Sequence, residues 1–221
     1  MSQIKLNFLS GKAYPQLTKK GVEVGSSLGH DLSIKYGKTF SQNTPKMING
    51  LGPCIGIGIF SPTQKFLAHS APEIDMNLGR IPQFIAESIY KMRESAKCKD
   101  DEISAVIYGG IAYDSENPVS HSSCQLVDEI EEGCRLEGIE PTIITGQYSD
   151  GLNTRINSYI GKNQITLWGK LIDKIKLGKE SPLTEIQKTL ENFFEYVKLP
   201  NNTKLETINE LPAITERLCT K

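Results

Sequence analysis

One cysteine and one histidine have the types and spacing needed for nucleophilic chemistry. Cys54 follows Gly50-Leu51-Gly52-Pro53, a segment in which glycine permits the backbone conformations of a tight turn. Such a turn can present a thiol together with free backbone N–H groups that hold an oxyanion. His69 follows fifteen positions later and can serve as the base that forms the thiolate. The pattern predicts a Cys54–His69 pair, with a buried cysteine and a structural histidine as the alternative interpretation.

A predicted β-hairpin must bring these two side chains together. Residues 55–60 and 65–70 are rich in β-forming residues, and Ser61-Pro62-Thr63-Gln64 between them is typical of a turn. Pairing of the two strands would place His69 on the strand next to the one that begins after Cys54.

The remaining elements predict an α+β sandwich of mixed sheets with two main helices. We expect helices at 81–97 and 123–137, and strands at 4–9, 21–25, 103–108, 142–145, 155–159 and 164–168. The chain then divides into three segments. Residues 1–45 form an N-terminal extension with short strands packed on the core, and 46–170 form the main domain. Residues 171–221 form a helical appendage, with one helix from Leu183 through Val197 and a short second one within 204–221.

Composition excludes several classes of protein. The 221 residues carry 25 Lys and Arg against 26 Asp and Glu, which argues against a nucleic-acid partner. The longest uncharged stretch, 47–64, is interrupted by glycines and prolines, so we expect no membrane insertion. The first residues do not resemble a signal peptide, which predicts a cytoplasmic protein or export by a route without one.

Neither a metal nor a cofactor is expected. The five cysteines include no C-x-x-C pair, and with three scattered histidines they form no zinc signature. The paired glycines at 50 and 52, and at 56 and 58, lack the third glycine and the following helix of a dinucleotide-binding loop.

Several short motifs, taken in order, resemble the chemoreceptor glutamine deamidases of the CheD family. Leu51-Gly52-Pro53-Cys54 is similar to the family's glycine-rich turn with its nucleophilic cysteine, and Ala68-His69-Ser70-Ala71-Pro72 is similar to its histidine strand. Later family features have counterparts in Ile107-Tyr108-Gly109-Gly110-Ile111, Leu136-Glu137-Gly138-Ile139, Asp150-Gly151, Arg155-Ile156-Asn157 and Gly161-Lys162-Asn163-Gln164-Ile165. The resemblance covers residues 46–170. The same sandwich carries the catalytic domains of cytotoxic necrotizing factor and related deamidating toxins.

The resemblance implies a cysteine-dependent protein-glutamine deamidase that uses a thioester intermediate and no cofactor. Cys54 and His69 would be catalytic, and the partner would be a protein that bears the target glutamine. That target is a chemoreceptor or, for a secreted effector, a regulatory protein of a host cell.

The sequence departs from the family at the group that orients the histidine. The family's threonine falls on Ile48, and Pro53 replaces a serine. Candidates for orienting His69 or forming the oxyanion hole are Ile48 through its carbonyl, Asn49, Gly52 and Ser70. The alternative function is a catalytically inactive binding module that regulates a partner protein by contact.

Overall fold

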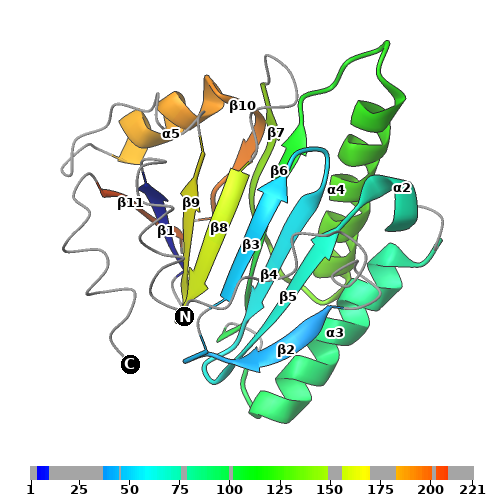
Figure 1. Ribbon diagram of the computed structural model, residues 1–221. Coiled ribbons are helices and arrows are strands. Elements are labelled where there is room, and N and C mark those ends of the chain that lie inside the picture. Colours follow the sequence, from blue (N-terminus) through cyan, green and yellow to red (C-terminus); the bar gives the residue numbers. More distant parts are fainter. Residues whose placement is uncertain are drawn as a thin grey trace.

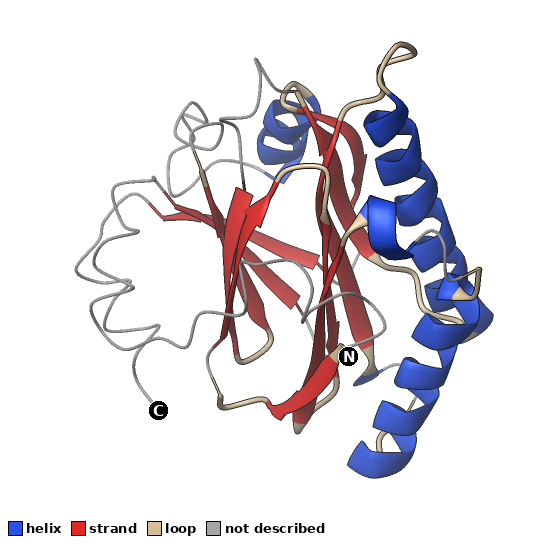
Figure 2. Cartoon of the chain, turned by 45° about the vertical axis from the view of Figure 1, so that its right-hand side comes forward, coloured by secondary structure: helices blue, strands red, loops and turns tan. Residues whose placement is uncertain are grey.

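Two mixed β-sheets packed face to face form the centre of the protein. The computed structural model describes residues 4–9, 37–44, 46–75, 79–99, 102–148, 156–169, 183–200 and 203–208. The predicted strand at 21–25 and the motif residues Asp150, Gly151 and Arg155 lie outside these ranges. Figure 2 shows the two sheets side by side, with the long helices on the outer face of one of them. The α+β sandwich predicted from the sequence is confirmed.

The first sheet has five strands in the order β11-β1-β9-β8-β3. Its strands are β1 (Ile4–Leu9), β3 (Lys46–Leu51), β8 (Ile156–Gly161), β9 (Gln164–Trp168) and β11 (Thr203–Ile208). β1 pairs in parallel with both β9 and β11, so strands from the two ends of the chain lie beside each other (Figure 1). The predicted 164–168 hairpin strand and the 4–9 strand are thus both members of this sheet.

The second sheet has six strands in the order β10-β7-β6-β4-β5-β2. Its strands are β2 (Lys38–Ser41), β4 (Ile55–Phe60), β5 (Gln64–Ser70), β6 (Ser104–Ile111), β7 (Thr142–Gln147) and β10 (Phe194–Lys198). The β4–β5 hairpin is antiparallel, as predicted, and the β6–β7 pair is parallel.

Helices α3 (Ile81–Ala96) and α4 (Pro118–Leu136) cover the outer face of this second sheet, and a short helix α2 (Pro72–Asp75) follows β5 (Figure 1). α4 begins five residues before its predicted start at Ser123. Asn117 caps it by accepting a hydrogen bond from the Val119 amide at 3.0 Å, and Pro118 occupies its first turn.

The sequence of β4 shows how both faces of the sheet are packed. Ile55, Ile57 and Ile59 belong to the hydrophobic cluster beneath α3 and α4. Phe60 belongs instead to the cluster between the sheets. Because alternate side chains of a strand point to opposite faces, Gly56 and Gly58 face the other sheet. A Cβ at Gly58 would lie 3.3 Å from Ile165 of β9, so glycine here allows the sheets to approach closely.

The helical appendage predicted for the C-terminal segment is wrong in its second half. Helix α5 (Leu183–Glu191) is present, but it ends before Phe194, where the chain becomes β10 and pairs antiparallel with β7. Residues 203–208, expected to begin a short helix, form β11. Pairing with the open edges of β7 and β1 outweighs the helical spacing of the apolar residues here.

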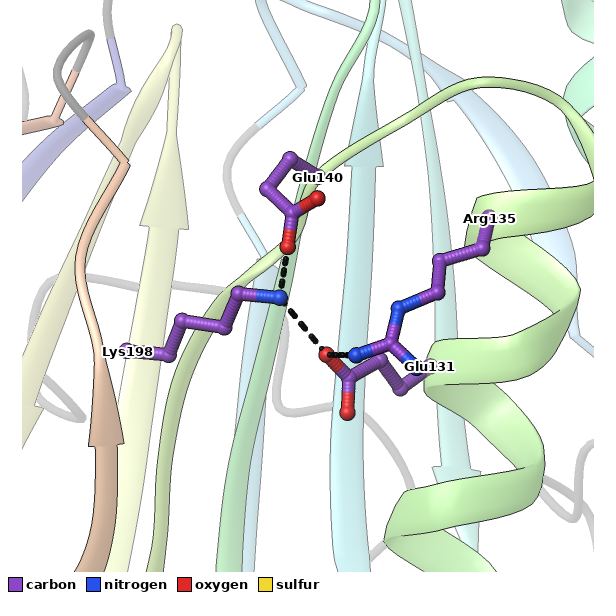
Figure 3. Close-up of polar contacts among 4 residues, drawn as sticks. All are labelled: Glu131, Arg135, Glu140 and Lys198. Carbon is purple, nitrogen blue, oxygen red and sulfur yellow. Dashed lines mark hydrogen bonds and ion pairs between the residues drawn. The ribbon is translucent and has the colours of Figure 1, made fainter.

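An ion-pair cluster fixes β10 against α4 (Figure 3). The buried Glu131 of α4 accepts hydrogen bonds from Lys198 at 2.8 Å and from Arg135 at 2.6 Å, and Lys198 also pairs with Glu140. The positive charge of Lys198 on β10 is thereby balanced by two carboxylates, Glu131 on α4 and Glu140 on the loop between α4 and β7.

No helix within the described ranges is long and apolar enough to cross a bilayer.

Candidate functional site

The predicted nucleophile lies in a short connection between the two sheets. β3 of the first sheet ends at Leu51, and β4 of the second begins at Ile55, so residues 52–54 cross from one sheet to the other. All three crossing residues are half-buried. The chain bends here because glycines interrupt β3, where the register shifts between Ile48 and Leu51 and Gly50 has a φ of 74°.

Three hydrogen bonds from other elements hold this bend. The carbonyl of Leu51 accepts from the Gln147 side chain at 3.1 Å, that of Pro53 from Ser123 at 2.8 Å, and that of Cys54 from the Gly110 amide at 3.0 Å. Each donor comes from a different element, namely β7, α4 and β6. The backbone at Cys54 is therefore fixed by elements that are distant in the sequence.

Cys54 is half-buried and packs against the cluster between the sheets. Cys98 and Cys124 are also half-buried, whereas Cys134 is fully buried in the helix-facing cluster. Burial raises the pKa of Cys134 to about 12, with a further contribution from Glu131. Cys134 is therefore an inert core residue, as the sequence suggested.

His69 lies on β5 on the same face of the sheet as Cys54. In the hairpin His69 pairs with Gly56, and paired residues of antiparallel strands point to the same face. A Cβ at Gly56 would contact Tyr108 and Leu51, two members of the cluster between the sheets, and Cys54 packs against this same cluster. His69 is 2% exposed.

The register relates the two residues diagonally. Ile55 pairs with Ser70, so continuing the ladder by one residue would place Cys54 opposite Ala71, two positions from His69. Diagonal neighbours on one face are separated by about 7–8 Å at Cα, within reach of longer side chains. The register therefore places His69 beside Gly56, two residues after Cys54, at the end of the hairpin that the crossing enters.

The orienting candidates are placed differently from one another. Ser70 follows His69 on β5, so its side chain points to the opposite face of the sheet, toward the helices. Its hydroxyl donates a hydrogen bond to Asp75 at 2.6 Å. Ile48 is buried, and its carbonyl accepts from Ser158 at 3.1 Å. A Cβ at Gly52 would meet no atom within 4 Å, so space is open beside it. Asn49 lies within β3, and its side chain is outside the described part of the structure.

A chain of hydroxyls next to Gly56 was not recognised in the sequence. Tyr108 pairs with Gly56 from the side opposite His69, and its ring lies over the space that the glycine leaves. The Tyr108 hydroxyl bonds to Ser158 at 2.8 Å, and Ser158 donates to the Ile48 carbonyl. Burial raises the pKa of Tyr108 far above its usual value, so the phenol stays neutral. The available signal was a strand glycine, which often marks a close approach of other groups.

Metal ligands do not gather anywhere in the described ranges. Within them, no group of three or more His, Cys, Asp or Glu side chains is arranged to hold a metal ion.

Comparisons with known proteins leave the family open. No protein-family model matches the chain, and no curated protein matches it. Among solved structures, the crystal structure of the Bacillus licheniformis hypothetical protein YfiH is similar, with 13% sequence identity and a TM-score of 0.38. The match covers 57% of this chain and 60% of that one, so the chain spans about three fifths of the length of that structure. A similarity this distant assigns no function.

Proposed function

We propose that the protein is a cysteine-dependent deamidase that converts a glutamine side chain of a partner protein to glutamate. Cys54 is the nucleophile and His69 the base. The observation that supports the proposal is the β4–β5 register, in which His69 pairs with Gly56, two residues after the half-buried Cys54 that packs against the cluster between the sheets. The partner is a chemoreceptor or, for a secreted protein, a regulatory protein of a host cell.

The chemistry balances with water as the co-reactant. His69 takes the proton of Cys54, and the thiolate attacks the carboxamide carbon of the glutamine. The tetrahedral intermediate collapses as protonated His69 gives its proton to the leaving ammonia, and a thioester remains. His69 then deprotonates a water molecule, which hydrolyses the thioester to glutamate and restores the thiol.

The bend around Cys54 supplies the groups that would hold the oxyanion. Pro53 has no N–H, so the backbone donors of the crossing are those of Gly52 and Cys54. The space beside Gly52 allows a carboxamide to approach them. Removing one good oxyanion donor costs about 3–4 kcal/mol of transition-state stabilisation, so a catalytic bend must be rigid. The hydrogen bonds to the Leu51, Pro53 and Cys54 carbonyls supply that rigidity.

Orientation of His69 in this proposal does not rely on Ser70, whose hydroxyl is bonded to Asp75 on the opposite face. Ile48 stays a candidate through its carbonyl, which is already fixed by Ser158. Asn49 stays a candidate as well.

Thiol labelling tests the proposal directly. Iodoacetamide at neutral pH should modify Cys54 faster than Cys98 or Cys124, because the thiolate is the reacting form. His69→Ala should slow labelling of Cys54 and leave that of Cys98 unchanged. With a chemoreceptor cytoplasmic fragment as substrate, deamidation should release ammonia and increase the mass of one glutamine peptide by one dalton. Cys54→Ser should abolish both signals, and Cys98→Ser should not.

A binding module without catalysis is the second candidate function. This function is supported by two departures from the CheD family: Ile48 stands where the family has a threonine, and Pro53 stands where it has a serine. Equal labelling rates for the half-buried thiols, unaffected by His69→Ala, would favour this function over the deamidase.

A further inference from the structure

A cavity lies on the helix side of the six-stranded sheet, on the face opposite to the one that carries His69. It has a volume of about 280 Å³ and opens where the parallel strands β6 and β7 end, between α4 and β10. Its lining includes Gly110, Ser123, Cys124, Asp128, Glu195 and Tyr196. Crevices at the carboxyl ends of parallel strands are common ligand sites.

The cavity is negatively charged. Asp128 and Glu195 both line it, and neither takes part in an ion pair with any described residue. Two cations on the adjoining elements, Arg135 on α4 and Lys198 on β10, form their ion pairs with Glu131. Burial raises the pKa of the Cys124 thiol, and the negative charges of Glu195 and Asp128 raise it further.

Aromatic rings accompany these carboxylates. Tyr113 and Tyr196 line the cavity and are 55% and 42% exposed, so both rings are accessible at its opening. The Tyr113 ring stacks on His121 with centroids 4.8 Å apart, and its backbone amide donates to Glu195 at 2.6 Å. The carboxylate and the ring are thus held in fixed positions at the rim.

We propose that this cavity binds the guanidinium group of an arginine side chain presented by a partner protein. Guanidinium is planar, pairs with carboxylates and stacks on aromatic rings, whereas the ammonium group of lysine is a compact and strongly hydrated charge. Arginine and tyrosine are also enriched where proteins contact each other. The proposal goes beyond the deamidase function and does not depend on any reaction at Cys54.

Two residues of the cavity also support the Cys54 bend. Ser123 and Gly110 line the cavity and also donate the hydrogen bonds that fix the Pro53 and Cys54 carbonyls. The cavity and the bend therefore share two structural residues.

Protection of Cys124 from alkylation tests this proposal in the full-length protein, because Cys124 lines the cavity. The probe is N-acetyl-arginine methylamide, which presents the side chain as a protein would. It should slow labelling of Cys124 several-fold and saturably, with labelling of Cys98 unchanged. The citrulline analogue has nearly the same shape without the charge and should protect poorly. Equal protection by both compounds, or none by either, overturns the proposal.

The same protection experiment on variants of the two carboxylates is the second part of the test. Asp128→Asn and Glu195→Gln should each weaken protection by about tenfold, which corresponds to about 1.4 kcal/mol. Glu132→Gln removes the same charge from the exposed surface of α4 outside the cavity and should change nothing. Unchanged protection in both cavity variants overturns the site. Stronger protection by free arginine than by the capped compound would assign the cavity to a free amino acid and overturn the protein partner.

Discussion

Gly56 is the residue on which the geometry of the candidate site depends most directly. It lies between His69 and Tyr108 in the register, and the Tyr108 ring occupies the space where a side chain would stand. A methyl group there would lie 2.5 Å from the ring and 2.9 Å from Leu51. The glycine therefore permits the packing that carries the Tyr108–Ser158 hydrogen bond.

Gly56→Ala should destabilise the protein by about 1–3 kcal/mol, the usual cost of overpacking a filled core. The measurement is the free energy of unfolding in urea. Gly52→Ala is the matched control, because its methyl group would meet nothing within 4 Å, and its effect should stay within about 0.5 kcal/mol. Equal losses in the two variants would contradict this account of Gly56.

Lys65 is a second residue whose burial has a measurable effect. Its ammonium group, fully buried on β5, donates to the carbonyls of Gln42, Ile160 and Gly161, and so links the two sheets. Burial, with a smaller contribution from Lys46, lowers the pKa of Lys65 from 10.5 to about 8.

The sign of the resulting pH dependence follows from this shift. Between pH 8 and 10.5 the unfolded chain holds more protons at Lys65 than the folded one, so this group makes stability rise with pH. The free energy of unfolding of the wild type, minus that of Lys65→Met, should therefore increase across this range by on the order of 2–3 kcal/mol. The raised pKa of Cys134 makes stability fall with pH in the same range. This contribution is the same in the wild type and in Lys65→Met, so it cancels when the two free energies are subtracted. Parallel curves for the two proteins would contradict the prediction.

At the scale of elements, the contact between α4 and β10 depends on Glu131. Glu131→Gln removes the carboxylate that pairs with Arg135 and Lys198, and should cost about 1–3 kcal/mol because this side chain is buried. Glu87→Gln removes an exposed carboxylate paired with Lys91 on α3 and should cost at most about 0.5 kcal/mol. Thermal unfolding compares the two, and a loss in Glu87→Gln as large as in Glu131→Gln would refute the role assigned to the cluster.

Elements with strong local signals could be predicted from the sequence. The isoleucines of α3 repeat with helical spacing and Pro82 stands in its first turn, so this helix was predicted to within one residue. The β4–β5 hairpin has an equally clear turn. Residues 194–198 carry apolar side chains that also suit a helix. They form a strand because they can pair with the open edge of β7, which the local sequence does not reveal.

Some features of the candidate site can likewise be predicted from the sequence, and others cannot. The predicted placement of His69 on the strand next to the one that begins after Cys54 follows from one hairpin, which is a local structure. The outward direction of Ser70 follows from simple alternation along β5 and could have been deduced. The cavity beside α4 could not, because it combines residues from β6, α4, β7 and β10, and the last of these was expected to be helical.

For the whole molecule, the two sheets draw strands from all three segments that the sequence suggested. β1 lies between β9 and β11, and the cluster between the sheets includes Leu6, Leu190, Phe194 and Leu205 from outside residues 46–170. A fragment of residues 46–170 would leave β9 with an open edge and this cluster without part of its filling.

We therefore predict that the 46–170 fragment does not unfold cooperatively, whereas the full chain gives one sharp transition. Circular dichroism during thermal unfolding measures both. A sharp transition of the fragment near that of the full chain would show that residues 46–170 form an autonomous domain.

The central place of β1 also affects the order in which the protein can form during synthesis. β1 leaves the ribosome long before both of its neighbours, β9 and β11, which lie far downstream in the sequence. The hairpin that follows Cys54 can assemble while translation continues, but the five-stranded sheet cannot close until β9 and β11 have emerged. Until then β1 presents two unpaired edges, and a nascent chain stalled before residue 164 should be a preferred client of chaperones that recognise exposed strands.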